Sequence, residues 1–347
     1  MATSVTSYVD VVDDRNAPSP KYFTAPNTWQ AMMNIKAVKS YGNAYYYGSS
    51  GQINYQIHPT RIFNTPVKMS DTETTAIGMF AGSFQTDNRN LLIDMNCGGI
   101  PPNNLVYVYF DEAHFYRFNS EVIIGKNVTD CSYMFHACIE YNQPTTIPNK
   151  VTSCADMFGA CYKYNQPTAI PNNVTNCANM FKDSNHFNQP IIIPNSVTNC
   201  VSMFQSCYNM NSNVVIGKSV ENCVNMFASY AYGSDTSIAQ WMNVNEIYIP
   251  KSVKNCANMF VGHLTFPKNI YINNGGYGMN LCGMLWSQFQ TQTPRVNVYC
   301  SNISAISGVG TNYNDSLFNN RGVQYTGTTN GLYNSAYNIY LYQNYSG

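Results

Sequence analysis

The residues of this chain that could bind metals or carry out chemistry most readily are its 12 cysteines. Cysteines bind zinc when two to four residues separate the members of a pair, often with histidine nearby. Here the recurring pairs, such as Cys154 and Cys161, have six intervening residues, and no histidine recurs with them. This spacing predicts no metal site and no bound cofactor. We expect buried free thiols that act as small apolar side chains, in a protein made in a reducing cytosol. Disulfides between neighbouring repeats are the alternative.

No other group of residues forms a catalytic motif. The five histidines are spread along the chain, and none lies in an HExxH or Cys–His pattern. Asp111 and Glu112 are the only adjacent acidic pair in the repeated part, and neighbouring residues do not provide the separation of two catalytic carboxylates. The sequence also lacks a Gly-rich phosphate loop and a nucleophile elbow. It therefore predicts no catalytic residues.

A fixed period of 23 residues organises the middle of the chain. Cys131 is followed at this step by Cys154, Cys177, Cys200 and Cys223, and a Met-Phe pair follows each of them at a constant distance. A period of this length is typical of proteins in which one small unit stacks on copies of itself. Such scaffolds display surfaces, so the period favours binding or structure over catalysis.

The segment 151–173 shows the repeated unit most clearly. Cys154, Met157, Phe158 and Cys161 stand at i, i+3, i+4 and i+7, the spacing that predicts the buried face of a short helix. An Asn-Gln-Pro turn follows, and then a very short strand over 168–170. We expect the strands of successive coils to form a parallel sheet. The predicted fold class is an α/β repeat solenoid, with short helices and short parallel strands flanked by irregular terminal segments.

Two sets of repeated side chains are predicted to form ladders through the stack. The first is a column of buried thiols, and the second is a column of turn amides that bond backbone groups lacking a strand partner. A role of these asparagines in ligand contact is the rival interpretation. The two columns are Cys131, Cys154, Cys177, Cys200, Cys223 and Cys256, and Asn142, Asn165 and Asn188.

The repeated motif resembles a known family. The pattern V-T-x-C-x-x-M-F, followed by an aromatic residue and the Asn-Gln-Pro turns at 142–144, 165–167 and 188–190, is similar to the BspA-type branch of leucine-rich repeats. That branch occurs in bacterial surface proteins and in some phage proteins. The resemblance implies a leucine-rich-repeat-like scaffold used for adhesion or recognition. It implies no common catalytic site.

The repeat divides the chain into three parts. Residues 1–66 do not follow the period, and we expect an arm that covers one end of the stack or attaches to a partner. Residues 67–300 form the predicted solenoid, with clean repeats over 128–260. Residues 301–347 are rich in Gly, Asn and Tyr, and predict one or two strands that pair with the body or with a neighbour.

Candidate contact residues come from an insertion and from a variable position. Between Cys223 and Cys256 the step lengthens by ten residues, and insertions into repeats form loops on one face, which is often the binding face. A simple surface bulge is the alternative. The candidates are Tyr232, Asp235 and Trp241 in the insertion, and Glu140, Lys163, His186 and Asn209 in the repeats.

The composition restricts the partners. Only 10% of the residues are charged, and 18 basic residues balance 18 acidic ones. Nucleic-acid binding requires a basic field, so no nucleic acid is expected. No apolar stretch is long enough to cross a membrane, and the first 20 residues lack the pattern of a secretory signal. A surface rich in Asn and Tyr suits contact with sugars, proteins or identical neighbours, although an AT-rich genome also produces it.

These observations favour a non-enzymatic phage virion protein of the tail, fibre or capsid. We expect it to be synthesised in the host cytoplasm and assembled with other virion proteins or with itself. Its solenoid would present a surface to a host glycan or protein. The alternative is a bacterial or protist cell-surface adhesin of the BspA type. A glycan-cleaving enzyme is a third class, for which the sequence offers no carboxylate pair.

Overall fold

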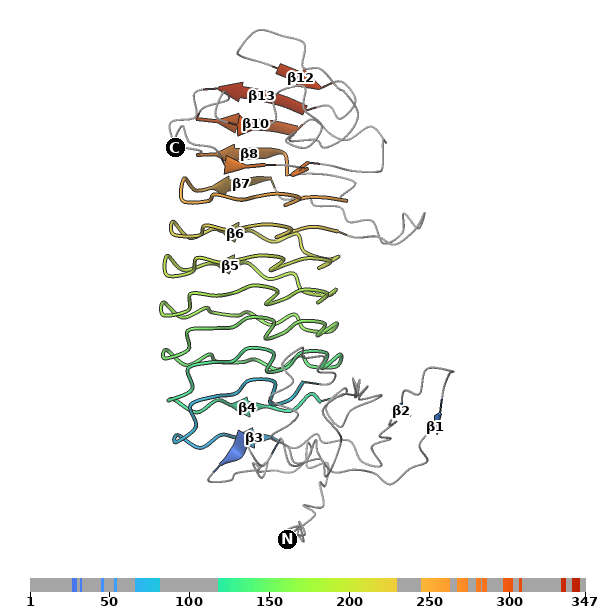
Figure 1. The fold of residues 1–347 in the computed structure, drawn as a ribbon, viewed down its shortest axis with the longest axis vertical. Coiled ribbons are helices and arrows are strands. Elements are labelled where there is room, and N and C mark those ends of the chain that lie inside the picture. Colours follow the sequence, from blue (N-terminus) through green and yellow to red (C-terminus); the bar gives the residue numbers. More distant parts are fainter. Residues whose placement is uncertain are drawn as a thin grey trace.

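The computed structural model describes the repeated part of the chain and several shorter segments. The described residues are 27–29, 32, 45–46, 53–54, 66–81, 118–229, 245–262, 267–273, 279–281, 283–285, 296–301, 306–307, 332–334 and 339–343. The repeats form a column of coils that ascends from one end of the molecule to the other (Figure 1).

Short parallel strands recur along one side of the column. The outer strands of successive coils are β3 (Val67–Lys68), β4 (Val122–Ile123), β5 (Ile191–Ile192), β6 (Val214–Val215), β7 (Glu246–Ile249), β8 (Asn269–Ile272), β10 (Val296–Cys300) and β13 (Ile339–Gln343). β3 pairs with β4, β5 with β6, and β7, β8, β10 and β13 form one parallel sheet. β12 (Leu332–Asn334) adds to β13 in the antiparallel direction. The expected parallel strands in a repeating pattern are confirmed, but the strand expected over 168–170 is wrong, because that segment and the equivalent 145–147 form no assigned strand.

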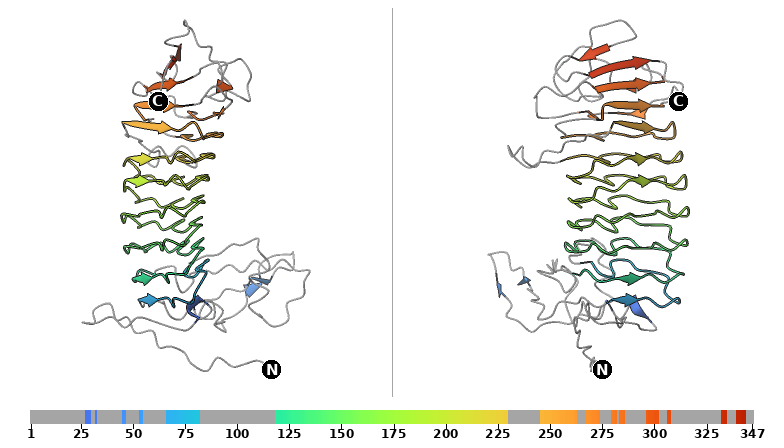
Figure 2. Two further views of the ribbon diagram at one scale, coloured as in Figure 1. Left: turned by 90° about the vertical axis from the view of Figure 1, so that its left-hand side faces the viewer. Right: turned by 180° about the vertical axis from the view of Figure 1, so that it is seen from behind.

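The other strands are short pairs. β9 (Met279–Asn280) and β11 (Ile306–Ser307) are parallel, whereas β1 (Tyr45–Tyr46) and β2 (Ile53–Asn54) are antiparallel. The side views show the coils stacked as successive layers (Figure 2). A second row of backbone pairings runs through these coils. This row consists of Thr75, Asp130, Ser153, Asn176, Asn199, Asn222, Asn255 and Asn280.

The helix expected in each repeat is wrong for the described coils, because the segment forms consecutive tight turns. In the coil of Cys154, the amide of Met157 donates to Cys154 O (3.2 Å) and the amide of Cys161 donates to Phe158 O (3.1 Å). Asp156 and Ala160, the third residue of each four-residue turn, have φ of 58° and 54°. A positive φ at that position defines a type II turn. Equivalent left-handed residues recur in the neighbouring coils.

The amides that the turns leave free bond to the next coil. Cys154, Asp156 and Phe158 donate to the carbonyls of Asn176, Ala178 and Met180, at 3.0, 2.8 and 2.9 Å. An α-helix would satisfy its amides internally and is about 10 Å wide, whereas paired strands stand about 4.8 Å apart. A helix would therefore not fit within one layer of this stack. The spacing i, i+3, i+4, i+7 gives the turns the same buried face that it would give a helix.

Two columns of stacked aromatic rings fill the centre of the coils. One contains Phe80, Phe135, Phe158, Phe181, Phe204, Phe227 and Phe260, with 5.3–5.7 Å between successive ring centroids. The other contains Phe118, Tyr141, Tyr164 and Phe187, with 5.9–6.1 Å between centroids. Rings of the two columns approach to 4.1 Å within a coil. All these rings are buried, and Met and Ile side chains complete the core.

Buried hydroxyl groups in the second aromatic column are paired. Tyr164 OH lies 2.8 Å from Thr168 Oγ1, and Tyr141 OH lies 2.8 Å from Thr145 Oγ1. Where the ring is Phe187, the residue four positions later is Ile191. The repeat thus changes both members together, because a buried hydroxyl without a partner is costly.

The segment before the first coil supports the end of the column. Thr28 and Trp29 have helical backbone, and Trp29 Nε1 donates to Ile77 O (2.9 Å). The amide of Ser70 donates to Thr28 Oγ1 (3.1 Å), and Met32 is buried. These contacts cover apolar surface at the terminal coil. Among the described residues, no helix is long and apolar enough to cross a membrane.

The left-handed turns generate a stability prediction. Ala160→Gly should stabilise the protein by up to about 1 kcal/mol, because glycine adopts a positive φ without the steric penalty of a Cβ. Ala155→Gly in the same coil should destabilise it by about 0.5–1 kcal/mol, because Ala155 has no positive φ to relieve. Chemical denaturation of both variants measures the two effects. A greater loss of stability in Ala160→Gly than in Ala155→Gly would contradict the turn assignment.

Candidate recognition surfaces

The repeated cysteines lie inside the coils and carry no chemistry that reaches the solvent. Cys131, Cys154, Cys177, Cys200, Cys223 and Cys256 are free thiols, and all are fully buried. Burial raises the pKa of the Cys154, Cys177 and Cys200 thiols, and the pKa of Cys300 rises to about 12. The reactive form of cysteine is the thiolate, so these side chains stay neutral and inert at ordinary pH.

A second thiol position uses its sulfur as a hydrogen-bond donor. Cys161 Sγ donates to Phe135 O (3.0 Å), and Cys207 Sγ donates to Phe181 O (2.8 Å). In the intervening coil the position is Ser184, whose hydroxyl donates to Phe158 O (2.6 Å). Either cysteine or serine therefore occupies this position, because either side chain can donate a hydrogen bond to the carbonyl of the preceding coil.

The repeated turn asparagines form a continuous ladder. The amide N–H of Asn165 donates to Asn142 Oδ1 (2.9 Å), and that of Asn188 donates to Asn165 Oδ1 (2.9 Å). Gln166 Nε2 also donates to Asn142 O (3.1 Å) and Oδ1 (3.1 Å). The asparagine side chains thus bond the coils together at the turn, rather than extending toward a ligand.

One row of variable side chains runs over the outside of four coils. The amides of Lys163, His186 and Asn209 donate to carbonyls of the preceding coil, each at 3.1 Å, which aligns them in register. Lys163 forms an ion pair with Glu140, whereas His186 and Asn209 are exposed. An exposed ion pair contributes about 0–1 kcal/mol, so the pair has little structural value. We call Glu140, Lys163, His186 and Asn209 the variable row.

The predicted candidates in the insertion lie outside the described residues. These are Tyr232, Asp235 and Trp241. In the sequence, Tyr232 stands 23 residues after Asn209, and so continues the register of the variable row.

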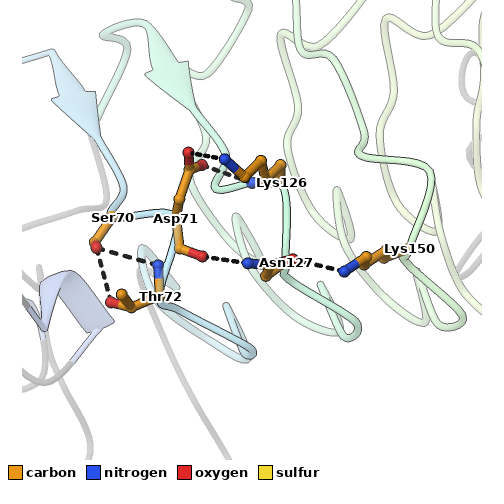
Figure 3. Close-up of polar contacts among 6 residues, drawn as sticks. All are labelled: Ser70, Asp71, Thr72, Lys126, Asn127 and Lys150. Atoms are coloured by element: carbon orange, nitrogen blue, oxygen red, sulfur yellow. Dashed lines mark hydrogen bonds and ion pairs between the residues drawn. The ribbon is translucent and has the colours of Figure 1, made fainter.

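A polar network at one edge of the strands ties the first coils together (Figure 3). Asp71 accepts hydrogen bonds from the amide of Lys126 (3.2 Å) and from its Nζ (2.7 Å), and these bonds lower the pKa of Asp71. Asn127 Nδ2 donates to Asp71 O (2.6 Å), and Lys150 Nζ donates to Asn127 Oδ1 (2.7 Å). Each of these bonds joins neighbouring coils, whereas Ser70 and Thr72 bond within one coil, so the network is structural.

One histidine–carboxylate pair lies on the turn side. His136 Nδ1 is 2.6 Å from Asp156 Oδ1, and the next coil position is Gly159, where a Cβ would lie 1.7 Å from that oxygen. Burial raises the pKa of nearby Asp183. Within the described part of the chain, no three His, Cys, Asp or Glu residues are arranged to hold a metal ion. The pair links two coils.

The outward side of the strands carries an apolar surface that the sequence analysis did not single out. Ile192, Val215 and Tyr248, which belong to β5, β6 and β7, are 72%, 55% and 48% exposed. Tyr248 begins a row of stacked tyrosines with Tyr271 and Tyr299, at 4.5 and 4.9 Å between centroids. Aligning the strands by their buried isoleucines would have revealed this row in the sequence.

Comparison with known proteins identifies the repeat. A family model described as "Mycoplasma protein of unknown function, DUF285" matches residues 107–192, 149–241, 171–273 and 194–294. The overlapping matches span more than half of the 347 residues, and the later ones begin about one repeat apart. The chain belongs to this family. The family description assigns no activity, enzymatic or otherwise.

One solved structure is similar in part. It is a leucine-rich repeat protein from Bacteroides ovatus, with 15% sequence identity and a TM-score of 0.32. The similarity covers 74% of this chain and 69% of that protein. No curated protein sequence matches the chain.

Substitution by serine should change the stability of the protein differently at the two cysteine positions. Cys177→Ser should destabilise the protein by about 1–3 kcal/mol, because the hydroxyl would be buried where the Cys177 thiol forms no hydrogen bond within the described coils. Cys161→Ser should change the stability by less than about 1 kcal/mol, because Ser184 occupies the equivalent position with a hydrogen bond.

Thermal denaturation of both serine variants beside the parent protein makes this comparison. Equal melting temperatures for Cys177→Ser and the parent protein would contradict the buried position of the first thiol column.

Proposed function

We propose that this chain is a non-enzymatic recognition protein whose coils form a BspA-like, leucine-rich-repeat-like solenoid. The variable row is the surface that contacts a partner. The single observation that supports this function is the contrast between the inside and the outside of the same coils.

Inside the coils, successive repeats place the same residue type at the same position. Cys154 and Cys177 are one example, and Phe158 and Phe181 are another. On the outside, Glu140, Lys163, His186 and Asn209 place an acid, a base, an imidazole and an amide at equivalent positions. Packing constrains the first set and does not constrain the second. A scaffold that holds its backbone fixed while its exposed residues differ is suited to recognition.

The composition favours a polar partner without a strong net charge. The chain has balanced charges, and the variable row has one cation that is already paired with a carboxylate. The exposed imidazole and amide offer hydrogen bonds, which suit a glycan or the polar rim of a protein surface. A surface glycan or surface protein of a cell is therefore the proposed partner class.

Two biological settings are compatible with this function. The virion setting, with other virion proteins as neighbours, follows from the sequence and stays a prediction. The cell-surface setting, in which the chain is an adhesin of the BspA type, is the alternative and also stays a prediction. In both settings the same row contacts a surface glycan or protein.

Binding to a glycan array and to intact bacterial cells tests the proposal. The purified chain should bind a defined glycan or cell type, and the triple variant Lys163→Ala, His186→Ala, Asn209→Ala should lose at least about 10-fold in affinity, because hydrogen bonds in the contact are removed. The matched control is Asn172→Ala, Asn195→Ala, Lys251→Ala, which removes three polar side chains from the opposite edge of the coils.

A loss of affinity in the control that equals the loss in the triple variant would contradict the assignment to the variable row. Absence of binding to every glycan and cell type would contradict the recognition function.

A further inference from the structure

The outward face of the strands forms a second surface, separate from the variable row. Nine coils each contribute one outward residue, seven of them from assigned strands, and we call this line of side chains the sheet-face row. It consists of Ile123, Thr146, Ala169, Ile192, Val215, Tyr248, Tyr271, Tyr299 and Tyr342. None of the nine is charged. Lys68 of β3, the partner of Ile123, continues the line at one end.

The exposed apolar area is greatest at the middle of this row. Ile192, Val215 and Tyr248 occupy the fourth, fifth and sixth places, and are 72%, 55% and 48% exposed. Thr146 and Ala169, nearer one end, are smaller or more polar. Protein interfaces concentrate large apolar side chains at their centre and polar residues at their rim. The sheet-face row has large exposed apolar side chains at its centre.

We propose that a second copy of this chain packs on the sheet-face row, to form a face-to-face dimer. The two subunits of the dimer are related by a two-fold axis near Val215. A two-fold interface brings the same patch of both subunits together. Each side chain therefore faces its own counterpart, or the residue at the same distance from the axis on the other side of the row. Val215 then lies against its counterpart, and Ile192 of each subunit lies near Tyr248 of the other.

Charge favours an identical partner. In the coils of Thr146, Ala169, Ile192 and Val215, the residues two positions before and after the row are Pro, Asn or Gly, and none is charged. Glu246 stands two positions before Tyr248, and a two-fold axis near Val215 places its coil opposite the uncharged coil of Ile192. Glu121 and Lys68 lie at one end of the row. Two identical uncharged surfaces approach without repulsion, whereas a surface that selects a different protein ordinarily carries charges for specificity.

The available area matches what a stable dimer needs. Nine coils at about 4.8 Å spacing give a face roughly 40 Å long, and the extended segment of each coil gives a width of roughly 15 Å. The resulting area of roughly 600 Å² is at the lower end of the ~600–1,000 Å² per partner of a standard interface. Face-to-face packing of two sheets is also a common arrangement in proteins.

The tyrosines of the row favour a protein partner over a sugar. The planes of Tyr248, Tyr271, Tyr299 and Tyr342 are inclined by only 6–17° to their neighbours, with centroids 4.5–5.0 Å apart. Each ring therefore covers the face of the next, and most ring faces are not available for stacking on a sugar. The row presents ring edges on a regular surface, against which another sheet can pack.

Sedimentation velocity of the full chain over ~0.1–50 µM tests the proposal. The parent protein should sediment as a dimer of twice 38.9 kDa. Ile192→Lys and, separately, Val215→Lys should weaken the dimer by at least about 100-fold, because each places two unpaired charges at the centre of the interface. Both side chains are exposed in the single chain, so circular dichroism should show an unchanged fold.

Asn209→Lys is the matched control, because it adds the same charge at an exposed position of the variable row, and it should leave the dimer intact. A monomeric parent protein across this range would overturn the proposal, and so would a dimer that persists in both sheet-face variants. If the parent protein is a monomer that binds a glycan array, and the Ile192→Lys variant loses that binding, the proposal is overturned as well. The sheet-face row would then be assigned to a sugar. The sedimentation results do not depend on glycan binding, so the proposed recognition function is tested separately.

Discussion

The hydrogen bonds between successive coils set the spacing on which the rest of this structure depends. On the turn side, Cys154, Asp156 and Phe158 donate their amides to the next coil, while Met157 and Gly159 donate within their own turns. Backbone donors are thus satisfied alternately between coils and within them. This arrangement holds each layer at the thickness of one extended chain. It excludes a helix and requires left-handed residues such as Ala160, despite their steric cost.

The thin layer also determines which side chains can be inside. Residues at equivalent positions of successive coils stand directly above one another, so each buried side chain must pack well against a side chain of the same type. Flat rings such as Phe158 and Phe181, and small thiols such as Cys154 and Cys177, meet that requirement. A buried polar atom is tolerated where the adjacent coil supplies its partner, as Phe135 O does for Cys161. The same registration on the outside creates rows of exposed side chains. These rows are the surfaces on which both proposals depend.

The period, the parallel strands and the buried side chains could be predicted from the sequence, because a fixed repeat places equivalent residues in register. The helix prediction failed because the positions of Cys154, Met157, Phe158 and Cys161 satisfy a helix and a series of turns equally. Side-chain spacing does not report where the backbone amides bond. The residues at positive φ contained a partial signal, since Asn179, Asn225 and Asp156 belong to the types that tolerate it.

The candidate surfaces were predictable only in part. The variable row emerged from the alignment of repeats, because variation at one position is visible in a sequence. The sheet-face row did not emerge, because Ile192 and Val215 lie among apolar neighbours in the strand, and their exposure depends on which face of the strand points outward. Tyr164 and Thr168 are replaced together by Phe187 and Ile191 in the next coil. This joint change of two residues four positions apart was a further signal in the sequence, because it indicates that the two side chains are in contact.

Amide hydrogen exchange in the coil of Cys154 tests the central claim most directly. The coil-to-coil bonds predict that the amides of Cys154 and Asp156 are protected as strongly as that of Phe158, and that all three exchange only when the stack unfolds. The contrary result is rapid exchange at Cys154 and Asp156 together with protection from Phe158 to Cys161. That pattern belongs to a helix, whose first amides lack partners.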